Sequence, residues 1–79
     1  MLRLKKITLN IEEPITANDG EDIRVALNAL PLVMSVDVHF KDQSVIVYAG
    51  PKLDAGELTA AVRGAGFTAV PIEDPGIRK

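Results

Sequence analysis

Four stretches of the chain have the hydrophobic pattern of β-strands. Residues 4–12, 36–40 and 45–49 alternate between hydrophobic and polar positions, which is typical of strands with one buried face. A short polar segment, 41–44, fits a hairpin connection between the second and third strands, and 67–72 is a short last strand. In the first two strands, the residues predicted to face the core are Ile7, Leu9, Ile11, Val36, Val38 and Phe40.

Two further segments repeat their hydrophobic residues at helical spacing. The first, residues 18–30, opens with Asn18 and Glu21, which have the spacing of a capping box. Asp54 and Glu57 repeat that spacing before the second helical segment. The sequence therefore predicts two amphipathic helices, each burying one face.

The predicted order is strand, helix, strand, strand, helix, strand. This order is that of an α+β ferredoxin-like βαββαβ sandwich, with a four-stranded antiparallel sheet and two helices on one face. The first and third strands are central in this topology. Three connections then meet at one end of the sheet, namely residues 13–19, 41–44 and 64–66, and Gly66 suits the left-handed position after a helix.

The length of 79 residues fits one domain, 1–79, with an ordered core of about residues 4–72 and a flexible tail at 73–79. A chain this short has little interior in which to enclose a multi-residue active site. Ser35 and Ser44 have no histidine in evident reach, so no nucleophile and base are paired. We therefore expect a protein that is not an enzyme.

The amino-acid composition excludes several further classes of function. The chain has no cysteine, which excludes disulfides, thiolate nucleophiles and cysteine metal cages. Its net charge of -2 does not favour nucleic acid as a partner, because phosphate binding needs a basic patch. No apolar stretch approaches the roughly 18 to 20 residues of a membrane span, so we expect no membrane insertion and a cytoplasmic location.

Several local sequences resemble the heavy-metal-associated domain family. They are residues 8–11, 29–38, 57–62 and 64–67, and the resemblance extends from about Lys5 to Ile72. The family includes copper chaperones, mercury-binding proteins and the amino-terminal modules of metal-pumping P-type ATPases. The resemblance implies the ferredoxin-like fold and a role in metal handling or transport.

The family carries a Gly-Met-x-Cys-x-x-Cys motif in its first loop, and this chain departs from it. The glycine and methionine fall on Glu13 and Pro14, and the two cysteines fall on Thr16 and Asp19. A hydroxyl and a carboxylate lack the softness that Cu(I) prefers, so the resemblance carries over no metal ligand and no cofactor. Leu32 also replaces the glycine of the family's Leu-Pro-Gly-Val turn, so that turn must either avoid a positive φ or accept strain.

Oxygen ligands are the alternative source of a metal site. Five carboxylates surround the first loop and helix start, at Glu12, Glu13, Asp19, Glu21 and Asp22. They suit Mg²⁺, Ca²⁺ or Mn²⁺ chemically, but they match no calcium loop, and acidic residues in a first helical turn ordinarily complement the helix dipole. The single histidine, His39, is interpreted as a solvated strand residue rather than a ligand or a catalytic base.

We therefore expect a module that resembles metallochaperone domains, has lost the soft-metal thiolates and acts through protein contact, in a regulatory or interaction role. The candidate interaction surface is Pro14, Ile15, Thr16, Asp19 and Phe67, and the surrounding acidic residues favour a basic partner. Two placements of Ile15 remain open, an exposed tip or a core position. The alternative function is metal trafficking through the acidic loop or through ligands shared in a dimer, and the oligomeric state is open.

Overall fold

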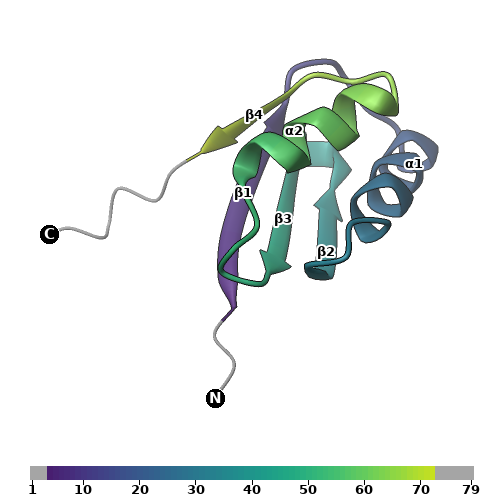
Figure 1. Cartoon of the computed structure of the whole chain (residues 1–79). Coiled ribbons are helices and arrows are strands. Elements are labelled where there is room, and N and C mark those ends of the chain that lie inside the picture. The colour runs from purple at the N-terminus through teal and green to yellow at the C-terminus, as the bar shows by residue number, and fades with distance from the viewer. Residues whose placement is uncertain (1–3, 73–79) are drawn as a thin grey trace, which may run out of the picture.

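The structure is a computed structural model that describes residues 4–72 (Figure 1). The tail predicted to be flexible, 73–79, lies outside the described residues. The elements in chain order are β1 (Lys5–Ile11), α1 (Ala17–Asn28), β2 (Val33–His39), the short 3₁₀ helix η1 (Phe40–Asp42), β3 (Ser44–Ala49), α2 (Ala55–Gly64) and β4 (Ala69–Ile72).

The four strands form one antiparallel sheet in the order β2-β3-β1-β4. The two helices cover one face of this sheet, with α1 beside β2, and the other face is left open (Figure 1). This arrangement confirms the predicted ferredoxin-like α+β fold, with β1 and β3 at the centre.

The core lies between the helices and the sheet. Strand β1 supplies Ile7, Leu9 and Ile11, as the alternation predicts. The remaining buried hydrophobic residues are Ile15, Ile23, Leu27, Val45, Val47, Ala49, Leu53, Leu58 and Val62. These residues form one continuous cluster, so a single core holds both helices against the sheet.

The boundaries differ from the prediction in three places. The cap of α1 is Thr16 with Asp19, not Asn18 with Glu21, so the helix begins earlier than expected and ends at Asn28. Strand β2 begins at Val33, three residues before the predicted start, and it ends at His39 because the chain turns into η1 there. Strand β4 is shorter than predicted and begins at Ala69.

The Phe40 side chain was predicted to face the core, and this prediction was wrong. Phe40 begins η1, which removes it from the alternation of β2, and 37% of its surface is exposed. Strand β2 keeps Val36 and Val38 half-buried against the core.

Among residues 4–72, two adopt a positive φ, and both follow the end of a regular element. Gly66 has a φ of 100° just beyond α2, as the sequence predicts. Gln43 has a φ of 55° in the turn before β3, which is uncommon for a residue with a side chain. Leu32 is not among the positive-φ residues, so its turn does avoid that conformation.

Candidate functional site

The first loop, the β2–β3 turn and the start of the β4 segment meet at one end of the sheet, as predicted from the topology (Figure 1). Gln43 joins the turn to the loop, because its side-chain amide donates to the carbonyl oxygens of Ile11 and Glu13, both at 2.9 Å. The backbone N–H of Ile11 donates in return to the Gln43 carbonyl at 2.7 Å. The left-handed backbone of Gln43 is therefore held by three hydrogen bonds, two to the last residue of β1 and one to the first loop.

Glu13 joins the first loop to the segment before β4. Its carboxylate accepts the backbone N–H of Thr68 at 2.7 Å and the Thr68 hydroxyl at 2.8 Å. These two hydrogen bonds, the backbone one first, lower the pKa of Glu13 from its usual value. The backbone N–H of Glu12 also donates to the Thr68 carbonyl at 2.9 Å, so the loop is fixed on this side as well.

The two positions that correspond to the family's cysteines contact each other. The Thr16 hydroxyl accepts the backbone N–H of Asp19 at 3.2 Å, and the Asp19 carboxylate accepts the backbone N–H of Thr16 at 3.0 Å. This reciprocal capping box satisfies two backbone donors at the helix start. Both side chains are therefore directed to the helix backbone of their own chain.

The five residues of the candidate interaction surface do not all lie at the surface. Pro14 and Thr16 are exposed, and Asp19 is half-buried. Phe67 is half-buried and packs against the core cluster. Ile15 is only 9% exposed and belongs to that cluster, so of its two predicted placements the structure shows the one in the core. Pro14 is then the exposed apolar residue of the loop.

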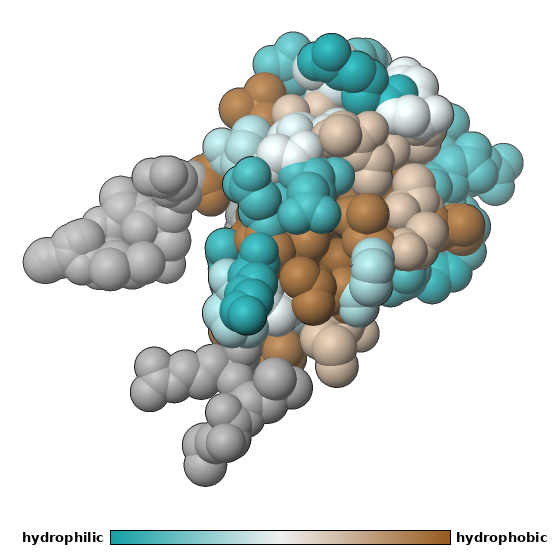
Figure 2. Space-filling model, viewed as in Figure 1, coloured by the Kyte–Doolittle hydropathy of each residue, from teal (hydrophilic) through white to brown (hydrophobic). Residues whose placement is uncertain are grey.

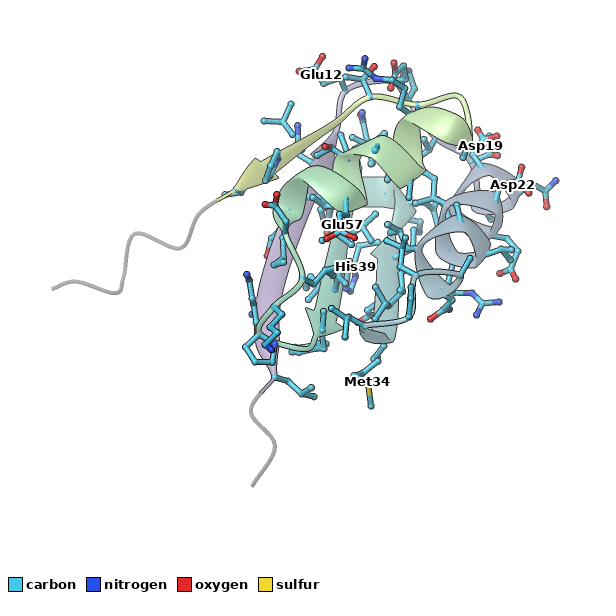
Figure 3. The ribbon with its side chains drawn as sticks, in the orientation of Figure 1. Glu12, Asp19, Asp22, Met34, His39 and Glu57 are labelled. Atoms are coloured by element: carbon cyan, nitrogen blue, oxygen red, sulfur yellow. The ribbon has the colours of Figure 1, made fainter. Side chains whose placement is uncertain are left out.

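The five carboxylates do not converge on a common point. Glu13 is engaged by Thr68 and Asp19 by the capping box, while Glu21 forms an ion pair with Arg24. Figure 3 shows Glu12 at the first loop, well apart from Asp19 and Asp22 on α1. Within residues 4–72, no group of three or more acidic or histidine side chains is placed to hold a metal ion.

His39 lies on the open face of the sheet, as predicted. Its Nε2 atom is 3.2 Å from the Oδ2 atom of Asp37, and both side chains are largely exposed. Ser44 of β3 lies directly opposite His39 in the pairing of β2 with β3, nearer than the sequence predicted. Among the described residues, no side-chain hydrogen bond joins His39 to Ser35 or Ser44.

Three contacts at this end of the molecule were missed from the sequence. The Thr16 and Asp19 cap has a sequence signal, because Thr-x-x-Asp is a shorter form of the usual capping box. The Gln43 contacts and the Glu13–Thr68 contact have no such signal, since each joins residues thirty or more positions apart. The surface at this end of the molecule is largely hydrophilic in the view of Figure 2.

Comparisons with known proteins show a similarity in structure. No protein-family model and no curated protein matches the chain in sequence. Among solved structures, the N-terminal domain of PacS from Synechocystis PCC6803 is 28% identical with a TM-score of 0.75, covering 87% of this chain and 98% of that one. Oxidized MerP from Ralstonia metallidurans CH34 is 21% identical with a TM-score of 0.82, covering 90% and 100%.

The CopZ metallochaperone is similar as well, with 24% identity, a TM-score of 0.78 and coverage of 84% and 100%. These structural neighbours are heavy-metal-associated domains, so the resemblance stated from the sequence is confirmed. The chain therefore has the fold of metallochaperone and metal-transport domains over nearly its whole described length. Within that length, no helix is both long and apolar enough to cross a membrane.

The residues at the ligand positions do not fit a soft metal ion. Cu(I) favours thiolate or thioether ligands, and the chain has no cysteine. The hydroxyl and carboxylate that replace the thiolates are used in the helix cap, and the loop is held by Gln43 and Glu13.

Proposed function

We propose that this chain is a non-catalytic, cytoplasmic protein-interaction module that uses the fold of metallochaperone domains without binding their soft metals. The observation that carries the proposal is the capping box between Thr16 and Asp19, because it commits both ligand positions to the helix start. A side chain that accepts a backbone N–H of its own helix is turned away from a metal ion outside the loop.

The rigid loop supports a contact role. Gln43 and Glu13 fix the loop from two sides, so its exposed residues are held in one arrangement before any partner arrives. A preorganised surface loses less conformational entropy on binding than a mobile one. The exposed part of this surface is Pro14 and Thr16, with the exposed Glu12 nearby at the first loop, which favours a partner with basic side chains.

Oxygen-based metal trafficking, the alternative function, has less support. The acidic side chains at this end are divided between Thr68, the helix cap and Arg24. A hard cation needs several oxygen ligands at one point, and the described residues provide no such group.

The test of the metal part is an amide NMR titration of the native chain and of the double variant Thr16→Cys/Asp19→Cys with Cu(I), Zn²⁺, Mg²⁺ and Ca²⁺. We expect no saturable shift at residues 12–22 of the native chain at micromolar ion. We expect the double variant to bind Cu(I), because the fold then presents two thiolates at the family's ligand positions. Saturable shifts of the native chain at these residues would reject the proposal in favour of metal handling.

The contact part is tested by photo-crosslinking in cells. A photoreactive residue replaces Pro14 in one variant and Ala60, an exposed position of α2, in a matched control. We expect a discrete adduct from position 14 that is lost when Glu12 is changed to Lys, and no such adduct from position 60. Equal adducts from both positions would contradict a contact surface at the loop.

A further inference from the structure

The end of the sheet opposite the first loop carries exposed hydrophobic side chains. The first residues of β1 and β2 both pair with Ala49, the last residue of β3, so Leu4, Gly50 and Leu32 lie just beyond this row. The backbone N–H of Gly50 donates to the Leu32 carbonyl at 2.9 Å, which fixes the turn before β2 against the end of β3. Leu4 is 47% exposed and Leu32 is 40% exposed.

Met34 extends this hydrophobic surface, because an irregularity in β2 turns it out of the strand. Val33 pairs with Ala49 and Ser35 pairs with Tyr48, so Met34 is the extra residue of a bulged step. A bulge changes the direction in which a side chain points. Figure 3 shows Met34 pointing away from this end of the molecule, and the residue is 58% exposed. The strand is therefore built so that a large hydrophobic side chain faces solvent here.

Three lysines lie at the same end. Lys5 and Lys6 begin β1, and Lys52 is exposed in the connection from β3 to α2. The Nζ atom of Lys5 donates to the carbonyl oxygen of Leu53 at 2.7 Å, which brings this connection against the start of β1. Basic and hydrophobic side chains thus share one surface, the lysine end, which consists of Leu4, Lys5, Lys6, Leu32, Met34 and Lys52.

The two ends of the sheet differ in charge. The first loop, the start of α1 and η1 carry the acidic residues Glu12, Glu13, Asp19, Glu21, Asp22 and Asp42. The acidic residues that follow the lysine end along the chain are Asp54 and Glu57, whose carboxylates accept backbone N–H groups at the start of α2. A negatively charged surface would therefore attract the lysine end and repel the loop end, which orients the whole molecule.

We propose that the lysine end binds reversibly to an anionic phospholipid surface. Lysines near such a surface are attracted by its headgroups, and exposed aliphatic side chains enter the boundary between headgroups and acyl chains. Protein interfaces are instead enriched in aromatic residues and arginine and depleted in lysine. The lysine end has lysine, leucine and methionine, so its chemistry favours lipid over an acidic protein.

This contact is peripheral and weak. Three hydrophobic side chains and three lysines are few compared with a stable anchor, so the bound and free chains exchange readily. The attraction depends on exposed charges, and salt therefore weakens it. The inference is independent of the proposed function, because the first loop lies at the other end of the sheet and stays free for a partner.

The experiment is flotation of the purified chain with vesicles of phosphatidylcholine alone, or of phosphatidylcholine mixed with phosphatidylglycerol. Lys52→Glu reverses a charge of the lysine end, and Lys41→Glu makes the same change at the opposite end, in η1. Met34→Ser removes one hydrophobic side chain. Its matched control is Val25→Ser, because Val25 on α1 is also 58% exposed. Amide NMR spectra verify that each variant is folded.

We expect the native chain to float with the anionic vesicles at about 0.1 M ionic strength, and to be released at about 1 M. It should not float with phosphatidylcholine alone. Lys52→Glu should bind at least about fivefold more weakly and Met34→Ser at least about threefold more weakly. Both controls should stay within about twofold of the native chain, since charges beyond about 10 Å are screened at the lower salt.

Amide NMR on the same vesicles locates the contact. Signals of residues 4–6, 31–34 and 50–53 should broaden first, and those of residues 12–22 should not. Broadening that begins at residues 12–22 would overturn the proposal, and so would equal losses of binding in Lys52→Glu and Lys41→Glu.

A native chain that does not float with anionic vesicles would also overturn the proposal. In that case a titration with polyglutamate distinguishes the other class of partner. Shifts at the lysine end with polyglutamate alone would assign this surface to an acidic protein segment instead of lipid. Equal flotation with both kinds of vesicle at either salt concentration would likewise reject the role of the lysines.

Discussion

Gly20 of α1 and Gly64 of α2 are both helical glycines, but their surroundings differ. A Cβ atom placed on Gly20 would lie 2.9 Å from the Cγ1 atom of Val38, closer than real Cβ contacts allow. A Cβ atom on Gly64 would have no heavy atom within 4 Å. The same substitution, glycine to alanine, is therefore expected to have opposite effects in the two helices.

The magnitudes follow from two opposing contributions. Replacing glycine by alanine in a helix stabilises by up to about 1 kcal/mol, and Gly64→Ala should show this gain with nothing against it. At Gly20 the new methyl group must displace Val38, whose branched side chain has little rotamer freedom. Overpacking of this kind costs about 1–3 kcal/mol, so Gly20→Ala should destabilise by up to about 2 kcal/mol.

The assay is urea unfolding followed by circular dichroism for the native chain, Gly20→Ala, Gly64→Ala, Val38→Ala and the double variant Gly20→Ala/Val38→Ala. Removing the Val38 methyl groups removes the clash, so the double variant should be more stable than the sum of the single effects predicts. The reasoning is refuted if Gly20→Ala is as stable as Gly64→Ala, or if the two substitutions at 20 and 38 are additive.

Further substitutions test the core, the loop and the cap. Leu27→Ala should cost about 2–5 kcal/mol in thermal unfolding because Leu27 is fully buried, and His39→Ala no more than about 0.5 kcal/mol; the reverse order would contradict the assigned faces. Glu13 has a lowered pKa in the folded state, so its contribution to stability is present above the ordinary carboxyl pKa and is lost as pH falls through the folded value. Between about pH 7 and about pH 3 the native chain should therefore lose more stability than Glu13→Gln, and equal losses in urea unfolding would contradict this. Without metal, Thr16→Cys/Asp19→Cys should be less stable by about 1 kcal/mol, since it lacks the helix cap; unchanged unfolding would argue against that role.

Much of the fold could be predicted because its elements obey local rules. The alternation at Ile7, Leu9 and Ile11 fixes which face of β1 is buried, and the structure confirms it. The cap of α2 at Asp54 and Glu57 was also correct. The predicted cap of α1 was wrong, because two overlapping pairs have the capping spacing, Thr16 with Asp19 and Asn18 with Glu21. The path of the first loop determines which pair forms the cap. Once Ile15 enters the core, Thr16 is the residue left at the helix start.

The candidate site was harder to predict, because its contacts join distant parts of the chain. Glu13 and Thr68 are 55 positions apart, and no local pattern relates them. The η1 turn likewise removes Phe40 from the alternation of β2, which a periodic pattern cannot anticipate. These long-range contacts show only in the folded chain, where three connections meet at one end of the sheet.

The first loop of this chain illustrates why a helix start cannot serve two purposes at once. A metal ligand at positions 16 and 19 must direct its donor atom out of the loop, while a capping side chain must turn back to the backbone N–H groups. Thr16 and Asp19 act as capping side chains: the Thr16 hydroxyl lies 3.2 Å from the backbone nitrogen of Asp19, and the Asp19 carboxylate lies 3.0 Å from that of Thr16. A loop without metal also lacks the cross-link that a bound ion supplies between two ligands. Here the cap, Gln43 and Glu13 supply links from within the chain, and the buried Ile15 side chain adds a core contact, so the loop is held in place without a metal ion.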